Sequence, residues 1–378
     1  MIAPRLEIDL GKIQFNARTL VKWLAVQGIS VTAVMKATLG SPEIAQAFLR
    51  AGVKTLGDAR IENITKMRQG GITAPMALIR SPMCSQVARV VKYTELSFNT
   101  ELDVISMLSA AAQKAKRIHG IVLMVELGDL REGILPNALS HAVREILRLP
   151  NIAIRGIGTN LACRSGVAPD AENMAALSAL ANSIESTFGL PLDIVSGGNS
   201  ANLDWALSGA DTGRINNLRL GESILLGCDP LHRQPINGLH TDAITLVAEV
   251  IESKLKPSQP WGTIAQNAFG RPATTETVGH IQQAILAIGR QDIDPLGLEP
   301  PHGIEILEAS SDHLVVRSSR FNHPVGTEIA FQPNYSALLR AMTSPFVSKI
   351  WKNRTTTMPS SLPLSKKTLL IPRYQENQ

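Results

Sequence analysis

The segment that decides the fold is Val31-Thr32-Ala33-Val34-Met35, which is followed directly by Lys36. This short run of apolar and β-branched residues is typical of a buried strand. Lys36 therefore lies where such a strand reaches the edge of its sheet. A lysine removed from water favours the uncharged amine, which is the form that attacks a carbonyl carbon to make a Schiff base. Solvated lysines are also common at strand ends, so this stretch leaves both interpretations open.

Similar segments recur along the chain as far as Leu220, separated by connections long enough for helices. The first connection, Leu10–Gln27, has apolar residues at helical spacing. Eight short buried strands joined in this way predict parallel pairing and a closed (β/α)8 barrel. An open doubly wound sheet is the alternative, but the first strand lacks the G-x-G-x-x-G turn of a dinucleotide site. The expected strands are Val31–Met35, Val53–Asp58, Pro75–Ser81, Thr94–Asn99, Gly120–Leu127, Ile152–Asn160, Leu190–Ser196 and Asn216–Leu220.

The pattern changes near Gly238, where short β-rich segments alternate with Gly, Pro and Asn turns. These segments predict a small, mainly antiparallel β domain. We expect a barrel over residues 8–237, a β domain over 238–350 joined by 1–7, and an extended or disordered tail over 351–378. The expected strands of the second domain are His240–Ser253, Pro260–Phe269, Gln283–Ile288, Ile304–Glu308, His313–Arg317 and Glu328–Gln332.

Composition indicates a globular protein. Of the 378 residues, 44% are hydrophobic and 18% are charged, which excludes disordered and fibrous classes. The formal charge of +5 is small and only 4% of residues are aromatic, so we expect no nucleic-acid partner. Cys84, Cys163 and Cys228 lack the spacing of a disulfide framework or zinc site, so we expect no metal. No export signal or membrane segment is apparent, which predicts a cytoplasmic protein.

Two segments are candidates for binding an anion. Ser196-Gly197-Gly198-Asn199-Ser200 follows the seventh barrel strand, and Leu218-Arg219-Leu220-Gly221-Glu222-Ser223 ends the eighth. Barrels often bind phosphate at these two loops, through backbone amides at the start of a helix. A lysine at the end of the first strand and a phosphate site on the last two are together what a pyridoxal phosphate enzyme requires.

Several motifs resemble those of the alanine racemase family, the fold-type III pyridoxal phosphate enzymes, and within it the ornithine-racemase-like branch. The similarity extends from about Leu6 to about Lys349. The motifs that carry it are Val34-Met35-Lys36-Ala37, Met124–Gly133, Ile194–Ser200, Asn217–Ser223, Ala284–Asp292 and Ser310–Leu314.

The resemblance implies a role for each site residue. Lys36 would carry the cofactor as an aldimine and serve as one of two acid/base groups. Arg219 would face the pyridine nitrogen and Arg131 would lie near the substrate carboxylate. The remaining cofactor contacts would come from Asn160, Asn199, Ser200, Gly221, Glu222 and Tyr335.

This chain also departs from the family pattern. Met124 replaces a lysine, Asn160 replaces a stacking histidine, and Leu39-Gly40 occupies the place of a tyrosine. Arg290 replaces the tyrosine that acts as the base on the opposite face, and arginine does not deprotonate in water. The candidates for this second base are His313, Asp292 and Cys163, with His313 preferred for its ordinary pKa. In the family the β domain completes a partner's site, which predicts a homodimer with shared active sites.

We therefore expect a racemase that exchanges the α-proton between two bases, acting on a basic amino acid such as ornithine. Glu126, Asp129 and Glu222 are candidates for binding a side-chain ammonium. The alternatives are a racemase of another or a broad range of amino acids, and a non-catalytic pyridoxal phosphate carrier, although related carriers lack a β domain. Decarboxylases and metal-dependent aldolases on the same scaffold use a cysteine of the β domain. Both are disfavoured here, because no cysteine follows Gly238.

Overall fold

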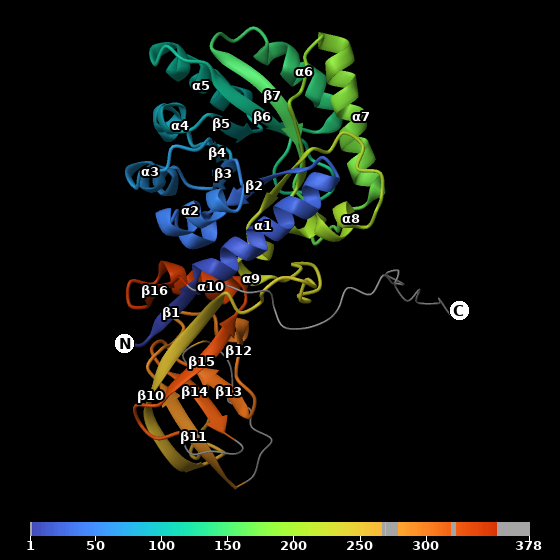
Figure 1. Ribbon diagram of the computed structural model, residues 1–378. Coiled ribbons are helices and arrows are strands. Elements are labelled where there is room, and N and C mark those ends of the chain that lie inside the picture. Colours follow the sequence, from blue (N-terminus) through green and yellow to red (C-terminus); the bar gives the residue numbers. More distant parts are fainter. Residues whose placement is uncertain (1, 267–268, 270–278, 319–322, 354–378) are drawn as a thin grey trace, which may run out of the picture.

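The computed structural model describes residues 2–266, 269, 279–318 and 323–353. The chain forms a barrel surrounded by helices and a second part made mainly of strands (Figure 1). The amino terminus lies at the β domain, and α1 leads from there to the barrel.

The barrel confirms the predicted (β/α)8 architecture. Its strands pair in parallel in chain order, and β2 pairs with both β3 and β9, which closes the ring. Each strand overlaps a segment expected from the sequence. The strands are β2 (Ser30–Val34), β3 (Thr55–Asp58), β4 (Met76–Leu78), β5 (Leu96–Asn99), β6 (His119–Met124), β7 (Ile152–Gly158), β8 (Ile194–Gly198) and β9 (Asn217–Leu220).

Helices cover the outside of the barrel (Figure 1). The predicted first helix is α1 (Leu10–Val26), which begins where the Asp9 side chain accepts hydrogen bonds from the amides of Gly11 and Lys12. The other barrel helices are α2 (Pro42–Arg50), α3 (Ile61–Gln69), α4 (Val87–Tyr93), α5 (Leu102–Lys114), α6 (Pro136–Ile146), α7 (Ala171–Phe188), α8 (Leu203–Leu207) and α9 (Glu222–Leu226). Short 3₁₀ helices are η1 (Lys36–Thr38), η2 (Cys84–Gln86), η3 (Ser200–Asn202) and, in the second domain, η4 (Pro295–Gly297).

The second domain is an antiparallel sheet in the order β12-β15-β10-β11-β14-β13. Strand β1, at the amino terminus, pairs with β10 and with β16, so both ends of the described chain join this domain. The elements are β1 (Arg5–Asp9), β10 (Ile244–Pro257), β11 (His280–Leu286), β12 (Leu298–Glu299), β13 (Ile304–Ala309), β14 (Leu314–Ser318), β15 (Glu328–Pro333), α10 (Tyr335–Thr343) and β16 (Ser348–Lys352).

Several details differ from the expectation for this domain, which did not include the short strands β12 and β16. The strand predicted at Pro260–Phe269 is wrong: residues 260–266 and 269 contain only an isolated bridge, and the remainder lies outside the described residues. The helix α10 was not predicted. Strand β16 extends to Lys352, two residues into the expected tail, because its backbone pairs with β1. Residues 354–378 lie outside the described part, and the division into domains remains a proposal.

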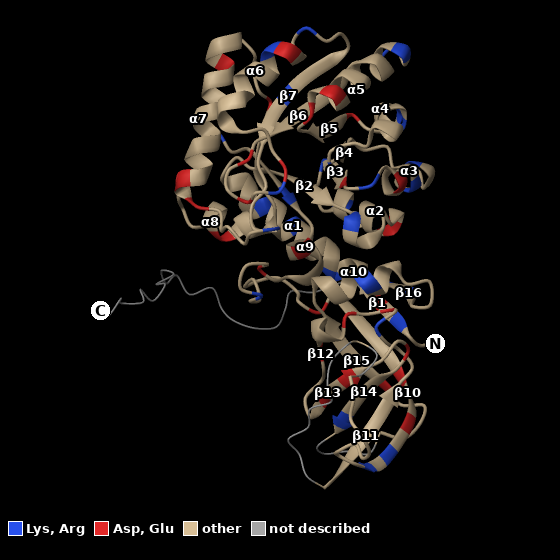
Figure 2. Ribbon diagram, turned by 180° about the vertical axis from the view of Figure 1, so that it is seen from behind, with Lys and Arg blue, Asp and Glu red and all other residues tan. Residues whose placement is uncertain are grey.

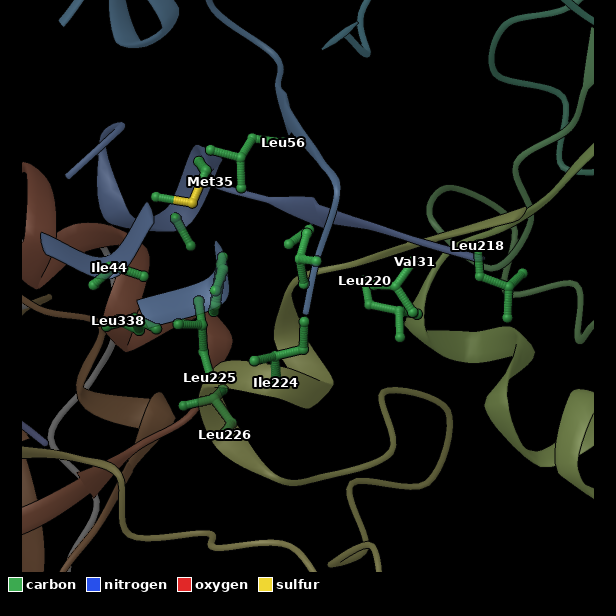
Figure 3. Packing of buried hydrophobic residues seen from close by; sticks show 14 of the residues in the cluster. Val31, Met35, Ile44, Leu56, Leu218, Leu220, Ile224, Leu225, Leu226 and Leu338 are labelled. Carbon is green, nitrogen blue, oxygen red and sulfur yellow. The ribbon is translucent and has the colours of Figure 1, made fainter. Parts of the chain in front are cut away.

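Helix α10 joins the two domains by apolar packing. Leu338 of α10 is fully buried in the same cluster as Met35 and Ile44 of the barrel (Figure 3). This apolar packing holds α10, which begins with Tyr335, next to η1, which begins with Lys36.

Charged residues of both signs are distributed over the helices of the barrel and the strands of the β domain (Figure 2). Among the described residues, none of the helices combines the length and apolarity needed to cross a lipid bilayer.

Candidate active site

A cavity of about 680 Å³ lies at the carboxyl ends of the barrel strands, where β/α barrels carry their active sites. Every barrel strand except β5 and β6 contributes a residue at or just beyond its end, and the loop after β6 contributes Arg131 and Glu132. Five cations and two carboxylates line the cavity, which suits an anionic ligand. The lining residues are Val34, Lys36, Ala37, Ala59, Ile79, Arg80, Ser81, Arg131, Glu132, Asn160, Ala162, Cys163, Asn199, Ser200, Ala201, Arg219, Gly221, Glu222, Pro230, Arg233 and Tyr335.

Lys36 opens η1 immediately after the buried strand β2. Of the two interpretations that the sequence left open, the structure supports the exposed lysine, because the strand ends at the rim and the side chain lies in the open cavity. Among the described residues it makes no hydrogen bond or ion pair, and its Nζ lies 5.8 Å from the centroid of the Tyr335 ring. The amine is therefore available to a ligand.

Asp58 is fully buried at the end of the neighbouring strand β3, directly before Ala59, which lines the cavity. Its carboxylate accepts hydrogen bonds from the Arg60 amide at 2.8 Å and from Asn63 Nδ2 at 3.1 and 3.2 Å. Burial raises the pKa of Asp58 to about 6, although these donors and the positive charge of Lys36 act to lower it.

Arg219 is a buried cation at the end of β9. Its Nη1 donates to Ser196 Oγ at 2.6 Å and its Nη2 donates to the Thr159 carbonyl at 2.8 Å and to Asn160 Oδ1 at 3.2 Å. Burial lowers the pKa of Arg219 to about 10, and none of the described carboxylates forms an ion pair with it. Because these neutral acceptors leave the guanidinium charge uncompensated, it offers a positive charge to the cavity.

Ser200 and Gly221 form the centre of the predicted anion site. Ser200 Oγ accepts from the amides of Gly221 and Ser223 at 3.4 and 3.3 Å and lies 3.0 Å from Ser223 Oγ. Both η3 and α9 begin here, and the first amides of a helix have no partner within it. A Cβ at Gly221 would lie 3.1 Å from Val34 Cβ, so glycine permits the close approach of β9 and β2.

Asn199 connects this site to the loop that follows β7. Its Nδ2 donates to Asn160 Oδ1 at 3.1 Å, to the Leu161 carbonyl at 2.9 Å and to Cys163 Sγ at 3.5 Å. Its Oδ1 caps η3 by accepting from the Ala201 amide. Asn160, Asn199 and Cys163 all line the cavity, and the three cysteines of the chain are free thiols.

Arg131 lines the cavity in a bidentate ion pair with the adjacent Glu132. The hydrogen bond to Glu132, assisted by Cys163, raises the pKa of Arg131. Glu132 lines the same cavity, although the sequence argument did not select it.

Two of the carboxylates expected to bind a side-chain ammonium lie outside the cavity lining. Glu126 Oε1 accepts from the amides of Gly128 and Leu130, and Asp129 is fully buried and accepts from the amides of Arg164 and Ser165. Both carboxylates are occupied by backbone donors that shape the loop.

Tyr335 is brought to the cavity by α10 of the β domain, and burial raises the pKa of its hydroxyl. Glu222 begins α9 and pairs with Arg233 Nη1 at 2.5 Å. Burial raises the pKa of Glu222, although Arg233 and Lys36 act to lower it.

His313 and Asp292 do not line the cavity of their own chain. His313 is exposed beside the start of β14. Asp292 is buried in the β domain, where it accepts from Ser344 Oγ at 2.6 Å. Arg290, at the position of the family's tyrosine, pairs with Glu308 at 2.9 Å and donates to the Ala309 carbonyl.

Sequence reasoning missed Asp58, Arg80, Glu132 and Arg233. Only two of them carried a usable signal. Asp58 ends a predicted buried strand, as Lys36 follows one, and Glu132 adjoins Arg131 in a motif already selected. Arg80 and Arg233 lie in loops whose position relative to the site depends on the fold.

Comparison with known proteins identifies relatives of the whole chain. A lysine racemase from Thermotoga maritima is 39% identical over 354 residues, covering 93% of this chain and 99% of that protein. An ornithine racemase from Acetoanaerobium sticklandii is 39% identical over 351 residues, covering 92% of this chain and 99% of that protein.

Solved structures show the same fold. The alanine racemase of Streptomyces lavendulae matches with a TM-score of 0.73 at 18% identity, covering 94% of this chain and 98% of that chain. The alanine racemase of Bacillus anthracis with bound L-Ala-P matches with a TM-score of 0.71 at 17% identity, covering 93% of this chain and 96% of that chain. A sequence model of the alanine racemase N-terminal domain matches residues 8–229. The chain therefore belongs to the alanine racemase family.

Proposed function

We propose that this protein is a pyridoxal phosphate-dependent racemase of a basic amino acid such as ornithine or lysine. Its membership of the alanine racemase family and its similarity to a lysine racemase and an ornithine racemase over almost the whole chain support this proposal. The observation that carries it is that one cavity contains the free amine of Lys36, the buried cation of Arg219 and the donors around Ser200.

The residues present fit the cofactor at each of its ends. Lys36 has no competing partner among the described residues and would bond to the aldehyde carbon. Arg219 has no carboxylate partner there and would donate a hydrogen bond to the ring nitrogen. The hydroxyl of Ser200, the helix-start amides near Gly221 and the hydroxyl of Tyr335 would bind the phosphate. Asn199 and Glu222 would border the phosphate, and Asn160 would contact the ring.

The chemistry that pyridoxal phosphate supplies when bound is withdrawal of electrons from the α-carbon of an amino acid, which acidifies its C–H bond. Arg219 donates hydrogen bonds and retains its proton near neutral pH, because even its lowered pKa is about 10. Lys36 Nζ would remove the α-proton from one face of the substrate, or return it there. Arg131 would orient the substrate by binding its carboxylate.

Racemisation also needs an acid/base group on the opposite face. Of the three candidates named from the sequence, only Cys163 lines the cavity of its own chain. We therefore prefer Cys163 to His313 and Asp292 for this role. His313 and Asp292 would serve only if a second copy brought its β domain to this cavity. We propose such a homodimer on the family resemblance, and a cytoplasmic location on the three cysteines, which are free thiols.

The experiment is to incubate the purified protein and pyridoxal phosphate with single enantiomers of ornithine, lysine and alanine in deuterated water. Chiral chromatography measures inversion, and mass spectrometry measures α-deuteration. Wild-type protein should invert a basic amino acid, and K36A should lose both inversion and the visible absorption of the bound cofactor. C163S should lose inversion by about 100-fold or more and still deuterate one enantiomer.

Each alternative predicts a different outcome. Visible absorption that depends on Lys36, without inversion of any amino acid, would indicate a cofactor carrier and refute the racemase. If C163S inverts the substrate as fast as wild type, the second acid/base group would be a residue of the partner copy. Preferential inversion of alanine would indicate a racemase with another substrate range.

A further inference from the structure

We infer that Glu132 selects a diamino acid as the substrate, by exchanging its ion pair with Arg131 for one with the side-chain ammonium of the substrate. This inference rests on the proposed function and names the residue that recognises the substrate class.

The loop that carries Glu132 is closed by backbone hydrogen bonds. Its ends are joined, since the Glu126 amide donates to the Ile134 carbonyl at 3.0 Å and the Ile134 amide donates to the Met124 carbonyl at 2.8 Å. The residue after Glu132 is Gly133, with φ of +152°, and a Cβ there would lie 2.3 Å from the Glu126 nitrogen. The backbone therefore holds Glu132 at a fixed place in the loop.

The three acids of this loop have different functions. The carboxylates of Glu126 and Asp129 accept backbone amides, which maintain the loop and attach it to the segment that follows β7. Glu132 accepts only from the side chain of Arg131 among the described residues, and both line the cavity. Glu132 is therefore the acid of this loop that a substrate can reach.

The charges of the cavity make such an acid necessary. Lys36, Arg80 and Arg219 bring positive charge to the cavity, which would repel the second ammonium of a basic amino acid. The other carboxylate of the cavity, Glu222, is paired with Arg233 and adjoins the predicted phosphate site. Glu132 is the carboxylate whose present partner, Arg131, is itself expected to bind substrate.

Exchange of partners explains the selectivity. Glu132 occupies the Nε and Nη2 donors of Arg131 in a bidentate pair, which is the geometry that a substrate carboxylate would use. A substrate carboxylate at these donors releases Glu132. A diamino acid then supplies an ammonium to the released carboxylate, whereas alanine leaves it uncompensated inside the cavity.

The test compares lysine with Nε-acetyllysine, which has a similar chain but no side-chain charge, in wild-type protein, E132Q, E132D and the control E145Q. Glu145 of α6 pairs with Arg148, and neither residue lines the cavity. E132Q should lose about 10- to 100-fold in kcat/KM for lysine and no more than about 3-fold for Nε-acetyllysine. E132D, which keeps the charge, should still prefer lysine, and E145Q should behave as wild type.

A second measurement does not depend on turnover. Calorimetric titration of each protein with racemic lysine should give an affinity about 10-fold weaker for E132Q than for wild type. Equal losses for lysine and Nε-acetyllysine, or an unchanged lysine affinity, would overturn the inference and leave Glu132 as a residue that only orients Arg131. Binding of lysine that depends on Glu132, without racemisation by the wild type, would refute the proposed function alone.

Discussion

Replacing Asp58 by asparagine should change how the stability of the protein depends on pH. Asp58 is fully buried at the end of β3, and its folded-state pKa is about 6 against an ordinary value of 3.8. Between these two values the folded protein binds a proton that the unfolded chain has lost. The stability due to neutral Asp58 is therefore fully present below pH 3.8 and is lost as the pH rises through 6.

The size of this effect follows from the two pKa values. A difference from 3.8 to about 6 corresponds to about 3 kcal/mol of unfolding free energy. The side-chain amide introduced by D58N would keep one oxygen as the acceptor for the Arg60 amide but would place its NH₂ group against Asn63 Nδ2. That mismatch has a cost that is independent of pH. The change with pH in the difference between variant and wild type therefore isolates the ionisation of Asp58.

The assay is urea unfolding of wild type and D58N at intervals from pH 3.5 to pH 8, followed by circular dichroism at equal cofactor loading. D103N is the control, since Asp103 is exposed on α5. The unfolding free energy of D58N minus that of wild type should rise by about 3 kcal/mol across this range. A difference that stays constant, or that grows toward acid, would refute the conclusion that Asp58 is buried as a carboxylate at neutral pH.

Two other predictions concern cofactor binding and acid stability. S200A, which removes a hydroxyl proposed to donate to the phosphate, should bind pyridoxal phosphate about 10-fold more weakly in absorbance titrations of the apoprotein, while the exposed S186A should not. Equal affinities would exclude Ser200 from the phosphate site. Burial lowers the pKa of His119, which is bonded to Ser97, to about 4 from 6.5, so its stability contribution is lost as the pH falls through this window. In urea unfolding, the free energy of unfolding of H119Q minus that of wild type should therefore rise by about 3 kcal/mol as the pH falls from 6.5 to 4. A free-energy difference that does not change with pH would contradict this prediction.

The sequence by itself determined the barrel, because each buried strand is a local apolar run and its helix follows from local periodicity. It also predicted that Lys36, Arg219, Ser200 and Gly221 lie close together, because the carboxyl ends of parallel strands meet at one edge of a barrel. These residues line one cavity. The segment near Pro260 was misjudged because β-rich composition does not specify the backbone partner that makes a strand.

Only the tertiary structure decided which of the remaining side chains share that cavity. Sequence reasoning preferred His313 to Cys163 as the second base, and it selected Glu126 but not Glu132, although both are acids of one loop. The fold directs Cys163 and Glu132 into the cavity, leaves His313 exposed elsewhere and occupies Glu126 with backbone amides. The physical reason is that a loop residue points where long-range contacts place its backbone, and such contacts join residues distant in sequence.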